Sequence, residues 1–265
     1  MIGAQVEGVD IHSSLSDEVI QSLRRALLEH HVLFFRDQRL EAAQLHTFGE
    51  RFGTPRPHYS APDGVDGHPG LVRIHTDANS PTNEGGGWHS DSSFDDVPPM
   101  GSILHLHTAP PLGGDTLFAN LAAVYESLSP SMQAFLGSLT AVHDSGPPYQ
   151  KYFKMRAEDM PQGRFNSAVH PVVRTHPETG RRVLYVSRYF TTRLVELEPS
   201  ESDALLDYLF SRIEQPRFHC RFKWQKNSVA FWDNRITQHH ALWDYYPSTR
   251  TGIRYTIAGD RPFLA

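Results

Sequence analysis

Residues 1–54 show a helical pattern of apolar side chains, a short apolar run and a second helical pattern. Apolar residues recur every three or four positions over 19–28, after Ser16, whose hydroxyl suits a helix cap. The run Val32–Phe35 is short and β-like, which predicts a buried strand. A second helix is expected over 41–52, ending at Gly53. The chain therefore opens as helix, strand, helix.

Residues 55–99 are rich in glycine, proline, aspartate, asparagine and histidine, and only 71–74 has a strand pattern. Long loops in a compact domain are typically functional, so we expect substrate-site loops here.

Beyond residue 99 the pattern of apolar and polar residues becomes that of β-strands. Strands are expected at 103–106, 115–118, 172–175, 183–186, 229–232 and 255–257. The turn at 177–180 predicts that the third and fourth of these form a hairpin.

The segment 218–224 alternates strictly between apolar and polar residues. This alternation predicts that Phe218, Cys220, Phe222 and Trp224 share one face of a sheet. Helices are expected at 130–139 and 200–213. The second helix should face inward through Leu205, Tyr208, Leu209 and Ile213. Together these patterns predict a mainly β fold with flanking helices, in a single domain over residues 1–265.

Composition and charge narrow the functional classes. Lys and Arg number 25 against 30 Asp and Glu, and a net charge of −5 argues against nucleic acid or an anionic membrane as partner. No apolar stretch approaches the roughly 18–20 residues of a membrane span, and the first ten residues lack an export signal, so we expect a cytoplasmic protein. The single cysteine, Cys220, excludes an intrachain disulfide. The 16 histidines suggest a metal site.

A metal site is best supported at His89 and Asp91. Residues two apart in an extended chain project to the same side, so both could reach one ion. His239 follows a distant apolar strand and offers a third ligand. Two histidines and one carboxylate form the facial triad of non-heme Fe(II) oxygenases, although the same donors also suit zinc, manganese and cobalt. The alternative interpretation of the His89–Asp91 pair, taken alone, is that the two side chains form a hydrogen bond at the surface.

Arg250 strengthens the oxygenase interpretation. It lies eleven residues after His239, so one strand, a turn and the next strand would return its guanidinium to the metal. Arginine binds carboxylates through two parallel hydrogen bonds, as a 2-oxo acid co-substrate would require. The alternative interpretation is that Arg250 is a solvated charge that follows the Pro247–Thr249 loop.

Six segments match a known family in order and spacing. They are Gly3–Asp10, Trp88–Phe94, Gly113–Leu117, His170–Pro177, Phe190–Arg193 and Trp232–His239. The chain resembles, over nearly all of its length, the taurine dioxygenase-type Fe(II)/2-oxoglutarate-dependent oxygenases. This resemblance implies a double-stranded β-helix, the jelly-roll barrel. It also implies that His89, Asp91 and His239 bind iron, and that Arg250 and Thr116 bind the distal carboxylate of 2-oxoglutarate.

The resemblance also indicates a substrate pocket. Arg254 matches the arginine that binds the sulfonate, whereas His58, Phe190 and Tyr149 match residues that line the pocket. An asparagine of the taurine-specific enzymes is replaced by Gly85, and a phenylalanine by Tyr149. Gly85 removes a hydrogen-bond donor and opens space, so other organic anions should be at least as good substrates as taurine. The alternative for Arg254 is an ion pair with Asp244 or Asp260.

The resemblance implies hydroxylation of a small organic anion with Fe(II), 2-oxoglutarate and O₂. Taurine or another alkylsulfonate would release sulfite and an aldehyde; alkyl sulfates, aryloxyalkanoates and acylated amino acids are alternatives. A homo-oligomer, dimer or tetramer, is expected. A zinc hydrolase is a different possibility, against which Arg250 and Thr116 argue. A jelly-roll binding module is a third, against which the three intact ligands argue.

Overall fold

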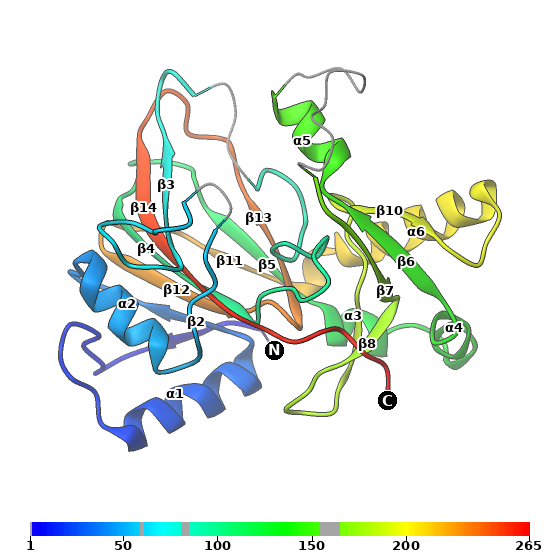
Figure 1. The fold of residues 1–265 in the computed structure, drawn as a ribbon, viewed down its shortest axis with the longest axis horizontal. Helices are drawn as coiled ribbons and strands as arrows, with labels where there is room; N and C mark the ends of the chain where they lie inside the picture. The colour runs from blue at the N-terminus through cyan, green and yellow to red at the C-terminus, as the bar shows by residue number, and fades with distance from the viewer. Residues whose placement is uncertain (1, 59–60, 81–84, 154–164) are drawn as a thin grey trace.

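Two β-sheets face one another, and helices cover the outer face of the larger sheet (Figure 1). The computed structural model describes residues 2–58, 61–80, 85–153 and 165–265. The larger sheet has the order β1-β2-β12-β4-β14-β3, and its neighbours are antiparallel except for β1 and β2. Its strands are β1 (Ala4–Val6), β2 (Val32–Phe35), β12 (Ser228–Asp233), β4 (Gly101–Thr108), β14 (Arg250–Ile257) and β3 (Leu71–Thr76).

The smaller sheet packs on the inner face of the larger one. Its antiparallel strands are β11 (His219–Phe222), β5 (Thr116–Asn120) and β13 (Thr237–Ala241). Phe34 of the larger sheet stacks on Phe222 of the smaller one with ring centroids 4.1 Å apart. Phe118 and Trp232 belong to the same buried core. This sandwich is the jelly roll that the sequence predicted, and the fold class is confirmed.

The outer face of the larger sheet is covered by α1 (Asp17–His30) and α2 (Ala42–Glu50). Leu27 of α1 and Phe48 of α2 pack there with Phe231, whose side chain points away from the sandwich. A strand with apolar side chains on both faces is buried on both sides, which explains the unbroken apolar run at 229–232.

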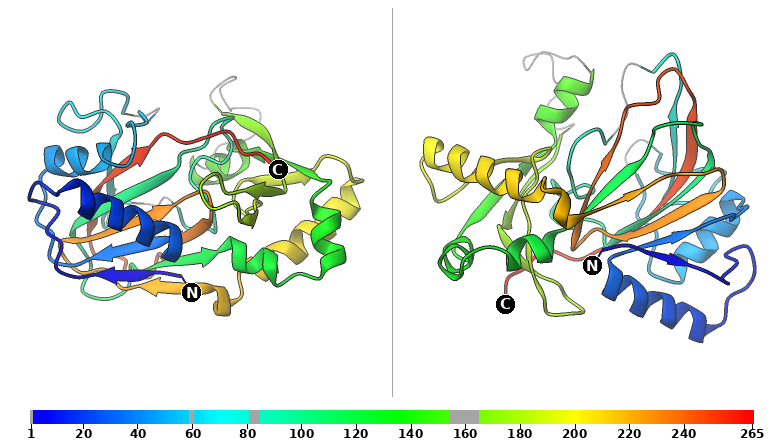
Figure 2. Two further views of the ribbon diagram at one scale, coloured as in Figure 1. Left: turned by 90° about the horizontal axis from the view of Figure 1, so that it is seen from below. Right: turned by 180° about the vertical axis from the view of Figure 1, so that it is seen from behind.

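A second group of elements lies on the flank opposite α1 and α2 (Figure 2). Its strands are β10 (Thr191–Leu194), β6 (Thr140–Asp144) and β7 (Ser167–Pro171), with the separate hairpin β8 (Val173–Thr175) and β9 (Arg182–Leu184). Its helices are α3 (Leu121–Glu126), α4 (Pro130–Leu136), α5 (Gly146–Phe153), α6 (Pro199–Ile213) and the 3₁₀ turn η2 (Pro216–Phe218). The hairpin predicted around 177–180 is therefore confirmed.

Two predicted side-chain orientations were wrong. Leu209 and Ile213 of α6 are buried as predicted, but Tyr208 is 43% exposed, and Leu206 and Phe210 complete the buried face of that helix. Phe218 belongs to the 3₁₀ turn before β11 and packs in the core of the second group, apart from Phe222. In both cases the spacing of apolar residues is compatible with two orientations of the side chain. Contacts with elements distant in the sequence decide which orientation forms.

Candidate metal centre and substrate pocket

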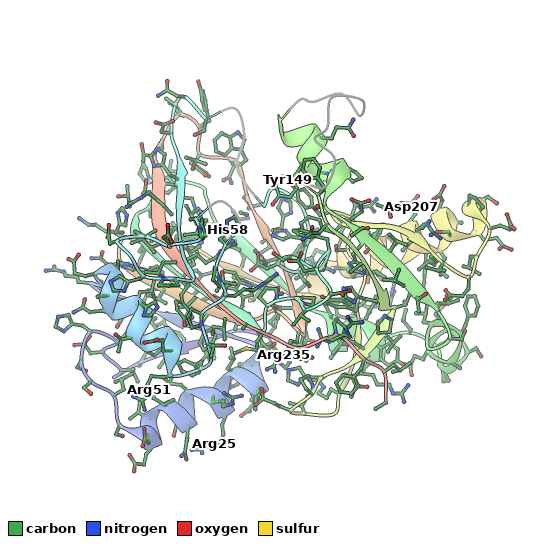
Figure 3. The ribbon with its side chains drawn as sticks, in the orientation of Figure 1. Arg25, Arg51, His58, Tyr149, Asp207 and Arg235 are labelled. Atoms are coloured by element: carbon green, nitrogen blue, oxygen red, sulfur yellow. The ribbon has the colours of Figure 1, made fainter. Side chains whose placement is uncertain are left out.

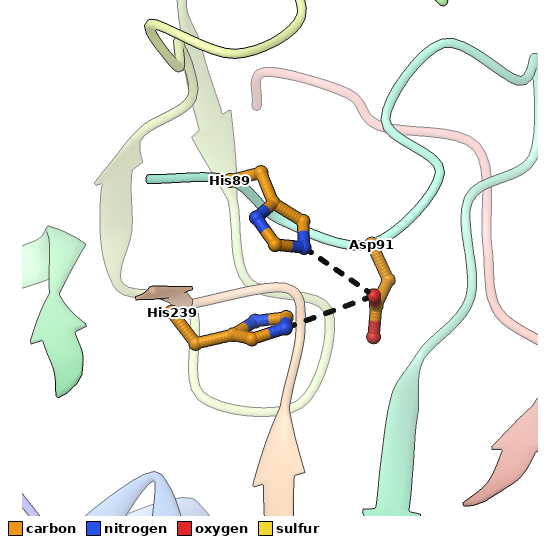
Figure 4. Close-up of side chains that lie close together, drawn as sticks. All are labelled: His89, Asp91 and His239. Carbon is orange, nitrogen blue, oxygen red and sulfur yellow. Dashed lines mark ion pairs between the residues drawn. The ribbon is translucent and has the colours of Figure 1, made fainter. Parts of the chain in front are cut away.

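Backbone pairing brings the two predicted histidine ligands together. The N–H of His89 donates to the carbonyl of His239 (3.1 Å), and the N–H of His239 donates to the carbonyl of His89 (2.9 Å). Residues directly opposite each other in an antiparallel pair project to the same side. The two imidazole rings accordingly lie with their centroids 4.2 Å apart (Figure 4).

Asp91 completes the group two residues after His89. Its Oδ1 lies 3.8 Å from Nε2 of His89 and 3.9 Å from Nε2 of His239 (Figure 4). The three side chains are buried, and their ligand atoms lie within 4.8 Å of one another. Metal–ligand bonds of about 2.1 Å to nitrogen and oxygen allow one ion to bridge each His–Asp pair. The residues therefore fit a metal bound by two imidazoles and one carboxylate.

The protonation of the three groups suits metal binding. The Nδ1–H of His89 donates to the carbonyl of Gly87 (2.7 Å), which leaves Nε2 to face Asp91. Burial lowers the pKa of His89, and it holds the pKa of His239 well below its ordinary value, so both imidazoles are neutral. Burial acts to raise the pKa of Asp91, but the charge of Arg254, together with the hydrogen bond from Ser102, outweighs it and brings that pKa well below its usual range. Neutral imidazole and ionised carboxylate are the ligand forms.

The backbone of Asp91 is held by Asn234, which sequence reasoning missed. Asn234 Oδ1 accepts from the N–H of Asp91 (2.7 Å), and its Nδ2 donates to the carbonyls of Asp91 (3.0 Å) and Pro99 (3.1 Å). Ser102 donates to Oδ2 of Asp91 (2.8 Å), so Oδ1 is the oxygen presented to the histidines. The signal in the sequence was an asparagine directly between an apolar strand and a ligand-bearing strand.

The predicted co-substrate residues Arg250 and Thr116 are linked through Trp224. The Nε1–H of Trp224 donates to Oγ1 of Thr116 (2.9 Å), so the hydroxyl hydrogen of Thr116 is directed to another acceptor. The guanidinium of Arg250 lies over the Trp224 ring, 5.5 Å from its centroid. Arg250 is 5% exposed, and its Nε has no hydrogen-bond partner within the described parts of the chain. A buried cation of this kind requires an anion.

Arg254 contacts the metal group directly. Its Nη1 donates to Oδ1 of Asp91 (3.1 Å), whereas its Nε has no partner among the described residues. The alternative pairing with Asp244 or Asp260 is not what the structure shows. Asp244 accepts from the N–H of Gly114 (2.7 Å), and Asp260 accepts from Arg174 (2.7 Å).

One inner cavity, of about 110 Å³, is lined by all nine side chains that the sequence singled out. They are His58, His89, Asp91, Thr116, Tyr149, Phe190, His239, Arg250 and Arg254. Figure 3 shows His58 on the side of β3 and β14, and Tyr149 at the base of α5. The strands and loops that carry these residues therefore converge on a single space.

The wall around the metal group is tight. Phe190 meets the His89 ring edge to face, with centroids 5.8 Å apart. Burial and the charge of Arg254 lower the pKa of His58 to about 4, so this side chain is neutral. Gly85 also lines the cavity, with a φ of +81° that disfavours other residues, and a Cβ there would lie 3.1 Å from Cε1 of His89. Glycine thus permits the close approach of this loop to the metal ligand.

Comparison with known proteins decides the family. Residues 1–256 match the model of the taurine catabolism dioxygenase TauD, TfdA family. The chain belongs to this family. The dioxygenase is 36% identical to an alkylsulfatase of Acinetobacter baylyi over 98% of this chain and 83% of the relative. It is 33% identical to an alpha-ketoglutarate-dependent sulfate ester dioxygenase of Pseudomonas putida over 98% of this chain and 88% of that protein.

A solved structure agrees with this assignment. A taurine dioxygenase from Burkholderia xenovorans superposes on the dioxygenase with a TM-score of 0.85 at 39% identity, covering 99% of this chain and 89% of the other. The predicted enzyme class, a 2-oxoglutarate-dependent dioxygenase that acts on a small organic substrate, is confirmed, and so are Fe(II), 2-oxoglutarate and O₂ as its cofactor and co-substrates. No helix in the described part of the dioxygenase is long and apolar enough to span a membrane.

Thr256 is a further pocket residue that sequence reasoning missed. It lies two positions after Arg254 on β14, so both side chains project to the same face of the strand. Thr256 is 8% exposed, and its hydroxyl has no hydrogen-bond partner among the residues described. Both side chains line an outer cavity that adjoins the inner one. The period of two residues would have identified Thr256 once Arg254 was selected.

Replacing Asn234 with alanine should weaken metal binding by about 10- to 100-fold, the usual effect of removing a group that orients a ligand. The cause is loss of both hydrogen bonds to the Asp91 backbone. Titration calorimetry with Mn²⁺ measures the affinity, and thermal unfolding reports the integrity of the fold. Ser102→Ala, which removes only the bond to Oδ2, provides a milder companion variant. Wild-type Mn²⁺ affinity in a folded Asn234→Ala protein would contradict this role.

Proposed function

We propose that the dioxygenase hydroxylates the carbon that bears the acidic group of a small organic anion. Taurine or another alkylsulfonate is the substrate class favoured by the family. The observation that carries the proposal is the placement of two arginines on one strand, β14, beside the metal group: Arg250, which is buried, and Arg254, which is half-buried. Arg250 and Arg254 each have an Nε without a partner in the described structure. Two separate cationic sites suit two separate anions, the co-substrate and the substrate.

The residues divide into three roles. His89, Asp91 and His239 would hold Fe(II). Arg250 and Thr116 would bind the distal carboxylate of 2-oxoglutarate. Bound iron supplies the oxidation, in which O₂ converts 2-oxoglutarate into succinate and CO₂ and one substrate C–H into C–OH.

Arg254 and His58 would orient the substrate. A neutral His58 donates or accepts one hydrogen bond at the head group, while Arg254 supplies the positive charge. Phe190 and Tyr149 exclude water beside the reacting carbon. A hydroxylated carbon attached to sulfonate then loses sulfite and becomes an aldehyde, without further help from the enzyme.

Alkyl sulfates are the second candidate substrates, favoured by the two relatives named for sulfate esters. The head group has the same charge, and hydroxylation next to the ester oxygen releases sulfate and an aldehyde. Aryloxyalkanoates and acylated amino acids carry a carboxylate that the same arginine would bind.

The test measures succinate formation with a panel of sulfonates, sulfates and carboxylates. Turnover should require Fe(II), 2-oxoglutarate and an anionic substrate, and sulfite or sulfate release identifies the substrate class. Neutral analogues of the same size should be turned over at least about 10-fold more slowly, because a hydrogen bond to a charged group contributes about 1.5–3 kcal/mol. Equal rates for anionic and neutral analogues would reject the proposal.

Thr256→Val should raise KM for the anionic substrate by roughly 10-fold or more, because one hydrogen bond to a charged acceptor is lost. This variant is cleaner than Arg254→Ala, which also removes a contact to the metal ligand Asp91. Thr47→Val, at an exposed position on α2, is the matched control for Thr256→Val. An unchanged KM for every anion in Thr256→Val would exclude its hydroxyl from the head-group site.

Arg254→Ala should impair coupled turnover by about 10- to 1000-fold while uncoupled 2-oxoglutarate consumption persists.

Other parts of the proposal rest on the sequence and the resemblance. We retain a single catalytic domain over residues 1–265, a cytoplasmic location, a homo-oligomer of two or four copies, and the absence of nucleic-acid and membrane partners. Size-exclusion chromatography with light scattering tests the oligomeric state.

A further inference from the structure

A second chamber extends outward from the metal group. It has a volume of about 470 Å³, compared with about 110 Å³ for the inner cavity. The two share a boundary of six residues. These residues are His58, Asp91, Ser92, Phe94, Tyr149 and Arg254. A substrate bound at Arg254 therefore reaches the metal on one side and the outer chamber on the other.

The size of the outer chamber indicates a substrate larger than taurine. Sites for organic ligands typically measure about 300–1,000 Å³, and the outer chamber falls within that range by itself. The aminoethyl chain of taurine adds only two carbons and one nitrogen to the sulfonate, so it would leave most of this space to water.

Several polar side chains on the described walls of the outer chamber bind one another, whereas the Thr256 hydroxyl has no partner among the described residues. Asp95 forms an ion pair with Arg56 and accepts a hydrogen bond from Nδ2 of Asn166 (2.7 Å). Ser145 donates to the backbone carbonyl of Asn166 (3.1 Å). The other carboxylate on the described walls, Asp91, belongs to the metal group and is paired with Arg254. An ammonium group would consequently lose its hydration without gaining a free carboxylate from these described walls.

Aromatic and proline side chains form another part of the described walls. The ring of Tyr149 lies between those of Phe94 and Phe165, with centroid separations of 6.4 and 5.8 Å. Pro57 and Pro62 also line the chamber. Aromatic and proline surfaces of this kind favour an uncharged apolar group.

We propose that the outer chamber binds the tail of the substrate, and that this tail is uncharged and either aromatic or branched aliphatic. The inference rests on the proposed function, because Arg254 must hold the anionic head group at the boundary between the chambers. It refines the substrate class from small organic anions in general to anions with a bulky apolar tail.

Taurine and propane-1-sulfonate provide a matched pair, because they differ in one position, where methyl replaces ammonium. Propane-1-sulfonate should have a kcat/KM at least about 10-fold higher than taurine, and 3-phenylpropane-1-sulfonate should be better again. Calorimetric binding of the three sulfonates to the Mn²⁺- and 2-oxoglutarate-loaded protein should give the same order. Preference for taurine in both measurements would overturn the tail proposal while leaving the proposed function intact. Failure of every anion to support succinate formation would instead reject the proposed function.

Phe165 tests the location of the tail, because it lines the outer chamber and not the inner cavity. Phe165→Ala should raise the dissociation constant for 3-phenylpropane-1-sulfonate by about 10-fold, as expected for loss of an aromatic contact. Binding of propane-1-sulfonate and of 2-oxoglutarate should change by less than about twofold. Phe135→Ala, at a 44% exposed position on α4, is the matched control. Equal weakening of the short and the phenyl-bearing sulfonate, or of neither, would place the tail elsewhere.

Discussion

Replacing Asp91 with alanine should abolish turnover and lower the affinity for Fe(II) or Mn²⁺ by more than about 100-fold. Removal of a group that only supports a metal ligand already lowers the metal affinity by about 10- to 100-fold. Asp91 is the single carboxylate of the metal group found in the described chain. The substitution also leaves the Arg254 guanidinium without its acceptor. Titration calorimetry with Mn²⁺ and succinate formation at excess Fe(II) measure the two effects.

Asp91→Asn separates charge from shape. It retains the backbone bonds to Asn234 and an oxygen that can accept from Ser102, but it removes the negative charge. We expect it to bind metal better than Asp91→Ala and still far more weakly than the wild type. Asp207→Ala, on the exposed side of α6 (Figure 3), controls for loss of an arbitrary carboxylate and should have wild-type activity. Full activity of Asp91→Ala at excess Fe(II) would refute the metal assignment.

The second large effect is expected at Arg250. Arg250→Ala should raise KM for 2-oxoglutarate by roughly 30- to several thousand-fold, since loss of one partner from a buried charge pair costs about 2–5 kcal/mol. The guanidinium is buried over Trp224, and its Nε is unpaired in the described structure. Steady-state kinetics with varied 2-oxoglutarate separates this KM effect from any change in kcat.

A truncated keto acid sharpens the test. The wild type should discriminate strongly against 2-oxobutyrate, which lacks the distal carboxylate, whereas Arg250→Ala should discriminate much less. Arg250→Lys keeps the charge without the two-pronged geometry, and its KM should fall between those of the other two proteins. Arg25→Ala, at an exposed position of α1 (Figure 3), is the matched control. If the wild type treats both keto acids alike, Arg250 does not bind the carboxylate.

Local sequence signals predicted the early elements well because their causes are local. Ser16 caps α1 by accepting from the N–H of Val19, and the αL residue His31 ends that helix one residue after its last helical position. The run Val32–Phe35 forms β2 with every side chain buried. The orientation of Tyr208 was wrong because one helical sequence can present either of two overlapping apolar faces, and α6 selects its face through contacts with distant elements.

By itself, the sequence, with the family resemblance that its motifs carry, selected the side chains that we expect to carry the chemistry: three metal ligands, two arginines and a hydroxyl. Only the tertiary structure decided how they are connected. Asn234 holds Asp91 across 143 positions of sequence, and Arg254 reaches the same aspartate across 163. Such contacts depend on which strands pair and how the two sheets stack, and no local periodicity encodes them. For the same reason the unpaired hydroxyl of Thr256 and the outer chamber, to which we assign the choice of substrate, form only when folding brings β14, the 55–58 and 91–95 loops and α5 together.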